Sequence, residues 1–350
     1  MIAEPWGRRG ARCAARYGLL AGVLVVTCLL AAAAAEDFSA LDRFLEDAAE
    51  TIGSCGLRLV RDGDVLYERV VGGFAVNTVV PVYSASKWLS AAVVAALVDG
   101  GALTLDDLAA DHFPALHVEE SPITLRHLLT HTSGLPGEVP DDGCTDTMAL
   151  QSCADRLSRL PVLTAPGRVF AYGEVSMQIA GAIAERAADS GWHELFAARI
   201  ADPLGMHETD YHAFAATTNP VIGGGGQSTL RDYSRFVTML LQRGRYDDRT
   251  ILSPEAVDLL LTDQTPEIVY GPEHGVGLGC WRERVDPESG EILLASAPGA
   301  NGFTPWVDFE HGVAGVLAVD GDGSKVRPIF LELLLLLDDL LETRDPAPDG

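Results

Sequence analysis

The spacing of apolar side chains divides the chain into segments with two different periodicities. Residues 55–73, CGLRLVRDGDVLYERVVGG, alternate apolar and polar positions on both sides of a DGD turn, which predicts a β-hairpin. Between about residues 84 and 265, apolar positions recur at helical spacing and are separated by loops. Alternation typical of strands returns over residues 275–321, and the apolar segment 326–342 predicts a final helix.

Strand patterns at both ends of the chain, around a helical block, predict the fold class. We expect an α/β protein of the α+β type, with an antiparallel sheet built from both chain ends, flanked by helices and carrying an inserted all-helical lobe. We assign a single domain to residues 36–345, with its sheet lobe at about 50–80 and 270–345 and its helical lobe at about 84–268. The acidic, proline-containing residues 346–350 are predicted to be a disordered tail.

The first 35 residues have a different composition from the rest of the chain. A basic head that includes Arg8 and Arg9 precedes the apolar run 19–35, which ends in alanines before Glu36. This order is typical of a secretory signal peptide, so we expect cleavage after Ala35 and a secreted or periplasmic location. An uncleaved membrane anchor is the alternative.

The charge of the chain limits its partners. The formal net charge is -25, and loss of the basic leader would leave the remainder more acidic still. We therefore expect neither nucleic acid nor a membrane surface as a partner, apart from a possible uncleaved anchor.

Four of the six cysteines follow the leader. Cys144 and Cys153 lie in a polar, loop-like stretch and are predicted to form a disulfide in an oxidising compartment. Cys55 and Cys280 lie in strand-like segments. A second disulfide between them is possible, but we expect two buried thiols.

The candidate chemistry begins with a lysine. The chain has two lysines, Lys87 and Lys325, and otherwise uses arginine. Lys87 follows Ser84 by three residues, so the two side chains share one face of a helix. A serine hydroxyl needs a neighbouring base to become a nucleophile, and a neutral lysine can be that base whereas arginine stays protonated. By itself, S-x-x-K is a weak pattern.

Longer motifs around this pair carry a family resemblance. VYSASKWLSAAVVAALVDGGALTLDD and ITLRHLLTHTSGLP are followed, in order, by PGRVFAYGEVSMQIAGAIAERAADSG, GGGGQSTLRDYSRFVTMLLQRG and PGANGFTPWVD. Together they resemble the serine beta-lactamase-like, penicillin-recognising hydrolases, and more narrowly their class C beta-lactamase and esterase branch. The resemblance covers most of residues 50–320.

The resemblance implies roles for particular residues. Ser84 matches the acylated nucleophile, Lys87 its partner base, and Tyr172 in AYGE the tyrosine of the family's Y-x-N motif. In the family, tyrosine and lysine together relay the serine proton and then activate water. The third motif falls at Ala297–Gly299, so the N–H of Ala300 would complete the oxyanion hole beside the N–H of Ser84. The resemblance implies no metal and no organic cofactor.

Two departures from the family motifs affect the expected chemistry. Glu174 stands where the family has asparagine. If Glu174 faces Lys87, it stabilises the ammonium and leaves Tyr172 as the direct base; alternatively, Glu174 points away.

Ala297 replaces a lysine or histidine that commonly holds a substrate carboxylate. Recognition of beta-lactams or D-Ala-D-Ala peptides is therefore in doubt, and neutral small-molecule esters or amides fit better. Two orientations of Ser296 are open: its hydroxyl supplies a substrate contact, or strand alternation turns it the other way. Gly299 completes the third motif.

We therefore expect an exported serine hydrolase that forms an acyl-enzyme on Ser84 and hydrolyses an ester or amide. Two alternatives stay open: a catalytically silent binding protein on the same fold, and a beta-lactamase or D-Ala-D-Ala carboxypeptidase. His127 and His131 have the spacing of a zinc pair, but the sequence lacks the glutamate that zinc peptidases place after the first histidine.

Overall fold

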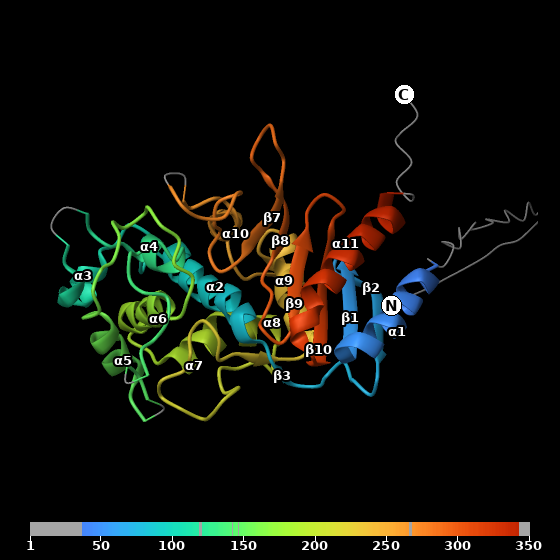
Figure 1. The fold of residues 1–350 in the computed structure, drawn as a ribbon, viewed down its shortest axis with the longest axis horizontal. Helices are drawn as coiled ribbons and strands as arrows, with labels where there is room; N and C mark the ends of the chain where they lie inside the picture. The colour runs from blue at the N-terminus through green and yellow to red at the C-terminus, as the bar shows by residue number, and fades with distance from the viewer. Residues whose placement is uncertain (1–36, 119–120, 142, 146, 266–267, 343–350) are drawn as a thin grey trace, which may run out of the picture. The chain divides into compact units, whose positions relative to one another are not determined.

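A six-stranded antiparallel sheet joins the two ends of the described chain (Figure 1). The computed structural model describes residues 37–118, 121–141, 143–145, 147–265 and 268–342. The strand order is β2-β1-β10-β9-β8-β7, so the first hairpin pairs with the last strand. The strands are β1 (Gly53–Arg61), β2 (Asp64–Val71), β7 (Trp281–Val285), β8 (Ile292–Ser296), β9 (Thr304–Asp308) and β10 (Val313–Gly321).

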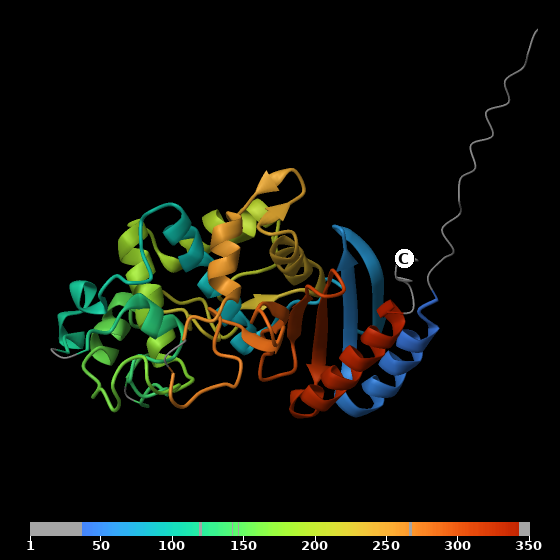
Figure 2. The same ribbon diagram turned by 90° about the horizontal axis from the view of Figure 1, so that it is seen from above.

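The alternation of side chains along β10 decides what each face of the sheet covers. Leu317 and Val319 pack with α1 (Ser39–Ile52) and α11 (Val326–Glu342), while Val316 and Ala318 belong to the core shared with α9 (Leu230–Leu241). Figure 2 shows α1 and α11 lying together on one face of the sheet, with α9 on the opposite side. The sheet therefore has two buried faces.

The helical block lies between β2 and β7 in the sequence. Its helices surround α2 (Ser86–Asp99), which is buried on nearly every side, as expected for an apolar helix at the centre of a lobe. The remaining α-helices are α3 (Ala109–His112), α4 (Leu125–Leu129), α5 (Leu150–Leu157), α6 (Val175–Ala188), α7 (Trp192–Phe196), α8 (Asp202–Leu204) and α10 (Pro254–Leu261). Two short ribbons complete the described chain: β3 (Val80–Pro81) with β4 (Gln227–Ser228), and β5 (Arg245–Tyr246) with β6 (Arg249–Thr250).

The predicted fold class is confirmed, with two differences in detail. The amphipathic helix α9 packs on β1, β9 and β10, although its sequence position suggested the helical lobe. Helix α1 was not expected; its Leu41, Leu45 and Ile52 are fully buried against the sheet. Periodicity identifies an amphipathic helix but does not indicate which core its apolar face joins.

Internal contacts divide the chain at residues 37 and 38. Residues from Phe38 onward form one unit, and of the preceding unit the structure describes Asp37 alone. The predicted signal peptide at 1–35 and the predicted tail at 346–350 both lie outside the described residues. Among the residues that are described, no helix combines the length and the apolar character that crossing a membrane would require.

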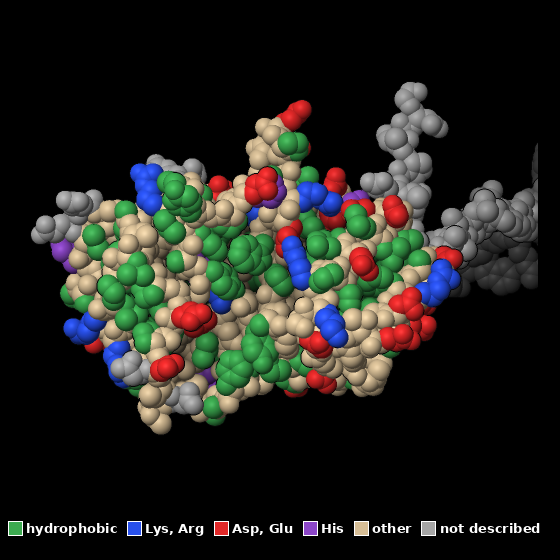
Figure 3. Space-filling view, viewed as in Figure 1, with side chains coloured by type: hydrophobic (Ala, Val, Ile, Leu, Met, Phe, Trp, Pro, Cys, Tyr) green, Lys and Arg blue, Asp and Glu red, His purple; other side chains and the backbone are tan. Residues whose placement is uncertain are grey.

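On the face shown in Figure 3, basic side chains are scattered among acidic and apolar ones and do not form a continuous basic patch. The sequence as a whole is strongly acidic.

The cysteine predictions agree with the structure. Cys144 and Cys153 form a disulfide, and Cys55 and Cys280 are free and buried. Burial raises the pKa of the Cys280 thiol to about 12 and that of Cys55 to about 11, so both remain protonated near neutral pH.

Removing the disulfide should destabilise the helical lobe. The bridge closes a loop with a sequence separation of 9 residues, and loop-closure entropy predicts a loss of about 2–3 kcal/mol of unfolding free energy in the Cys144→Ser/Cys153→Ser double variant. Urea unfolding of the oxidised wild type and the variant measures the difference. Equal midpoints would show that the bridge contributes nothing to stability.

Candidate active site

Ser84 lies in a single 3₁₀ turn, Tyr83–Ala85, that leads directly into α2. Tyr83 has a φ of 46°, in the left-handed region that non-glycine residues rarely adopt. Such conformations persist where surrounding structure holds them, and they concentrate at functional sites. The turn leaves Ser84 half-buried on the wall of a pocket, at the N-terminal end of the central helix.

Lys87 lies in the first turn of α2 and is 4% exposed. Its Nζ donates a hydrogen bond of 2.8 Å to the carbonyl oxygen of Gly223 and lies 3.5 Å from Oε2 of Glu174. The backbone N–H of Gly223 donates to Oε1 of the same carboxylate. Of the two orientations that the sequence left open, Glu174 therefore adopts the one facing Lys87. In the described part of the chain, Nζ forms its hydrogen bond with Gly223 and not with Ser84.

Two interlocked loops hold Tyr172 against Lys87. The segment after α4 hydrogen-bonds to the segment before α6: Ala171 N–H donates to the carbonyl of His131, and Glu174 N–H donates to that of Gly137. A Cβ on Gly173 would overlap the backbone of Gly137, so this close approach requires glycine. As a result, the Tyr172 ring lies with its centroid 4.8 Å from Lys87 Nζ, a cation–π contact.

Aromatic rings form one side of the pocket. Tyr172 stacks on Trp281 with centroids 5.6 Å apart. Phe170 contacts both of these rings, and His131 contacts Tyr172 and Phe170. The pocket is lined by Ser84, Lys87, His131, Phe170, Tyr172, Val276, Gly277, Gly279, Cys280, Trp281, Ala297 and Pro298. Ser84, Lys87, Tyr172 and Ala297, which come from three distant parts of the sequence, therefore meet at one pocket.

The loop after β8 approaches the segment that precedes Ser84. The side-chain amide of Asn301 donates to the carbonyl of Pro81 at 2.9 Å, and a Cβ on Gly299 would overlap the carbonyl of Val82. Gly299 is thus required for packing of this loop, and Ala300 is exposed beside it. This packing brings the two predicted oxyanion donors, Ser84 and Ala300, to neighbouring segments.

The substrate-binding role expected of Ser296 is contradicted. Its hydroxyl donates to the carboxylate of Glu283 on the neighbouring strand, β7. The same carboxylate accepts hydrogen bonds from Arg327. Alternation along β8 places the Ala297 side chain in the pocket and turns Ser296 away from it. The pocket therefore has neither a cation nor a hydroxyl at the third motif.

The two histidines of HLLTH have separate roles. Nδ1 of His127 accepts a hydrogen bond from the N–H of Thr124 in a capping box that begins α4. His131 lies beyond the end of that helix, with a φ of 57°. Burial, with the Lys87 charge as a smaller contribution, lowers the pKa of His131 to about 3, so the imidazole is neutral at physiological pH.

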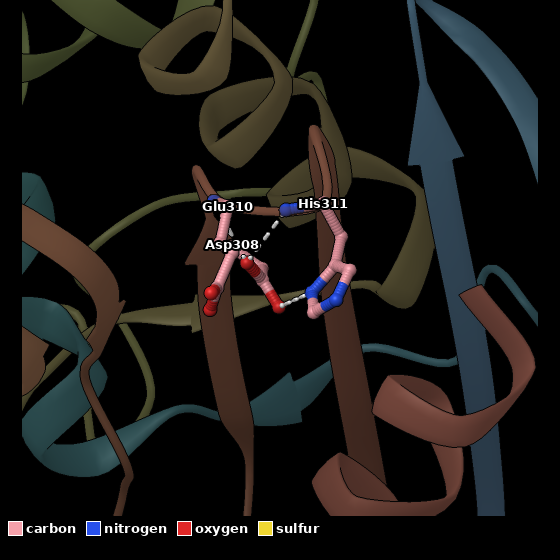
Figure 4. A group of neighbouring side chains, drawn as sticks. All are labelled: Asp308, Glu310 and His311. Carbon is pink, nitrogen blue, oxygen red and sulfur yellow. Dashed lines mark hydrogen bonds and ion pairs between the residues drawn. The ribbon is translucent and has the colours of Figure 1, made fainter. Parts of the chain in front are cut away.

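One cluster of possible metal ligands lies elsewhere, at the turn between β9 and β10: Asp308, Glu310 and His311 (Figure 4). Asp308 Oδ2 accepts from His311 Nδ1 at 2.9 Å. The guanidinium of Arg284 lies 2.9 Å from Glu310 and 3.5 Å from Asp308, and it also reaches Asp338 on α11. Because the Arg284 guanidinium already pairs with these carboxylates, the cluster is an ion-pair network that ties the turn to β7 and α11.

A family model described as Beta-lactamase matches residues 41–337. The chain belongs to the beta-lactamase family. A solved structure of a candidate beta-lactamase from Bacteroides dorei DSM 17855 is 33% identical, covers 86% of this chain and 98% of its own, and superposes with a TM-score of 0.78. The family resemblance expected from the motifs is thereby confirmed.

Two curated relatives in the family have named activities. The D-alanyl-D-alanine-carboxypeptidase/endopeptidase AmpH of Escherichia coli strain K12 is 26% identical over 308 residues, which cover 76% of this chain and 79% of AmpH. Esterase EstB of Burkholderia gladioli is 30% identical over 179 residues, covering 44% of this chain and 45% of EstB. Two curated relatives from Mycobacterium tuberculosis are 27% identical over 262 residues, and the chain spans 65% of their length. The activities named for AmpH and EstB are consistent with a serine hydrolase.

Several pocket residues were not identified from the sequence. Trp281 and Phe170 line the pocket, whereas Trp306 is fully buried against Phe330 on the far face of the sheet. The contacts of Gly223 with Lys87 and Glu174 had no sequence signal. Such assignments depend on which loops meet in space, and local patterns do not contain that information.

The neutral His131 should make stability depend on pH. Its pKa is about 3 when folded and near the ordinary 6.5 when unfolded, so between these values the unfolded chain binds the additional proton. The unfolding free energy should therefore fall as pH decreases from about 6.5 towards 3, by up to about 1.4 kcal/mol per pH unit from this group.

Urea unfolding at about pH 7 and pH 4.5 measures this dependence. In His131→Asn the histidine contribution should disappear, and asparagine tolerates the left-handed backbone at this position. The exposed His207→Asn serves as the control and should keep the wild-type dependence. An unchanged slope in His131→Asn would contradict the neutral imidazole.

Proposed function

We propose that this protein is an exported serine hydrolase that transfers the acyl group of a neutral ester or amide to Ser84 and then to water. The observation that carries the proposal is the meeting of Ser84, Lys87 and Tyr172 at one pocket, where Tyr172 comes from a loop distant in sequence from the turn and helix that contain Ser84 and Lys87. A hydroxyl, a fixed cation and a phenol at one cavity are the groups that acyl transfer through a serine requires.

The proposed acylation uses Tyr172 as the base. Lys87 is paired with a carboxylate, which favours its charged form, and that charge in turn favours the phenolate of Tyr172. The phenolate takes the Ser84 proton as Oγ attacks the substrate carbonyl. The resulting oxyanion is held by the N–H groups of Ser84 and Ala300. Tyr172 then returns the proton to the leaving alcohol or amine as the acyl-enzyme forms.

Deacylation repeats these steps with water as the nucleophile. The phenolate of Tyr172 accepts a proton from water, the hydroxide attacks the acyl carbonyl, and Ser84 Oγ leaves with the proton. The products are the free acid, the alcohol or amine released earlier, and the regenerated serine.

The pocket lining favours a neutral substrate. Ala297 supplies no charge where the family commonly places a cation, and aromatic rings also line the pocket. Lys87 is the one cationic side chain among the lining residues that the structure describes, and its Nζ is already paired with Gly223 and Glu174. A substrate carboxylate would therefore lose its hydration without gaining an ion pair, which is unfavourable.

Export is part of the proposal and is supported by two observations. The N-terminal sequence is that expected of a signal peptide. The disulfide between Cys144 and Cys153 is of a kind that persists in oxidising compartments outside the cytosol.

A catalytically silent binding protein is a second candidate function. The observation that favours it is the hydrogen bond of Lys87 to Gly223, which directs the ammonium to a partner other than Ser84. Glu174 is absent from the described lining of the pocket, so it does not block substrate entry. An open pocket that keeps all three reactive groups favours the hydrolase.

Reaction with a fluorophosphonate probe decides between the two. We expect one phosphonyl adduct on the wild type, detected by intact mass, and none on Ser84→Ala. Tyr172→Phe should react at least about a hundredfold more slowly, because it removes the base. A folded wild-type protein that forms no adduct would favour the silent binding protein.

The third motif generates a separate prediction about substrate charge. Wild type should turn over a carboxylate-bearing beta-lactam such as nitrocefin only at trace rates, while Ala297→Lys should increase acylation by it because a cation now faces the pocket. Ala297→Met, of similar length but uncharged, is the matched control and should give no gain. Substantial nitrocefin turnover by the wild type would instead support a beta-lactamase.

A further inference from the structure

We propose that Glu174 and Gly223 act together as a clamp that fixes Lys87 as an ammonium, and that Glu174 fits there because residue 223 has no side chain. Glu174 is thus a positioning residue that acts through Lys87. The catalytic consequence of the clamp rests on the proposed function, because the clamp determines which group takes the Ser84 proton.

The three residues form a closed set of polar contacts. Lys87 Nζ donates to the carbonyl of Gly223 at 2.8 Å and lies 3.5 Å from Glu174 Oε2, while the N–H of Gly223 donates to Glu174 Oε1. The backbone of Gly223 therefore contacts both members of the ion pair: its carbonyl binds the ammonium, and its N–H binds the carboxylate. The carboxylate also lies at the N-terminus of α6, where the helix dipole favours a negative charge.

In this arrangement, the space at residue 223 accommodates a glycine but not a side chain. A Cβ on Gly223 would lie 2.7 and 2.8 Å from the two carboxylate oxygens and 2.9 Å from Lys87 Nζ. Its φ lies outside the left-handed region, so the requirement for glycine is one of space and not of backbone conformation. The next residue differs: a Cβ on Gly224 would make ordinary contacts, at 3.5 Å to Val221 and 3.8 Å to Glu174.

Three other titratable groups near Lys87 are neutral: burial lowers the pKa of His131 to about 3, raises that of Cys280 to about 12, and also raises the pKa of Tyr211. Tyr172 contributes its ring face. Glu174 is the one carboxylate in ion-pair contact with Lys87 in the described chain.

A buried ammonium with a single counter-ion loses most of its stabilisation when that counter-ion is removed. The clamp therefore makes a direct prediction about the protonation of Lys87. With Glu174 present the amine keeps its proton, and without it the amine should lose the proton at lower pH.

Competitive acetylation measures this protonation without any requirement for activity. Acetic anhydride reacts with neutral amines, and peptide mapping by mass spectrometry resolves Lys87 from Lys325, the second lysine in the sequence. Lys325 is exposed and paired with Asp322, so it reports the reagent and the pH in the same sample. We expect the pH midpoint for labelling of Lys87 to move to lower pH in Glu174→Gln, with that of Lys325 unchanged.

Substitution of the two adjacent glycines tests the steric half of the clamp. Gly223→Ala should displace the carboxylate and shift the Lys87 midpoint in the same direction, whereas Gly224→Ala should leave it at the wild-type value. In a Glu174→Asn background, where the side chain is one methylene shorter, Gly223→Ala should have a smaller added effect. An unchanged Lys87 midpoint in both Glu174→Gln and Gly223→Ala would overturn the clamp.

Phosphonylation of Ser84 separates this inference from the proposed function. If Lys87 acts as a fixed cation, Glu174→Gln should react more slowly than the wild type. As the pH rises and Lys87 loses its proton, the reactivity of this variant should also decline at a lower pH than that of the wild type. Gly223→Ala should lose about a hundredfold, the effect expected when a reacting group is displaced by about 1 Å. Faster reaction of Glu174→Gln at neutral pH, accompanied by the labelling shift, would retain the clamp and overturn Tyr172 as the direct base in favour of the neutral Lys87. A labelling shift without any wild-type adduct would retain the clamp and reject the hydrolase.

Discussion

The burial of one ammonium group constrains most of this site. Lys87 lies in the first turn of a helix that is enclosed on nearly every side, and a charge in that position must be compensated by nearby polar groups. The compensation comes from a carboxylate before α6, a carbonyl from the loop before α9, and the face of an aromatic ring. The carboxylate and the ring lie two residues apart in one loop and the carbonyl lies in another, so satisfying one charge brings these two loops to the start of α2.

The segments around Lys87 are rigid for local reasons. The loop containing Tyr172 interlocks with the HTSGLPG loop through glycines that permit backbone contact, and the turn before α2 contains a residue in an uncommon conformation. Stacking of Tyr172 on Trp281 connects this helical side to the edge of the sheet. The pocket borders one core, to which its lining residues Cys280 and Ala297 belong.

The sequence predicted the parts of this arrangement that depend on local pattern. Ser84, Lys87 and Tyr172 were found because motif and spacing identify them, and the sheet was found because strand alternation occurs at both chain ends. The direction of Glu174 was not decided, since it depends on a glycine in a distant loop. The orientation of Ser296 was left open because a strand places neighbouring residues on opposite faces, and the sequence alone did not fix which face met the pocket. Trp281 was missed for a similar reason: its role follows from the loop that it lies against.

The contact between Asn301 and Pro81 has a consequence for when the site comes into existence. Ser84, the proposed nucleophile, lies in the first third of the chain, while the loop that would complete the oxyanion hole follows β8, near the other end. The first strand, β1, also pairs with β10, the last strand of the sheet. During synthesis, a chain that ends before this region contains Ser84 without the loop that packs against its segment. The surroundings of Ser84 are therefore completed late, when most of the polypeptide is present.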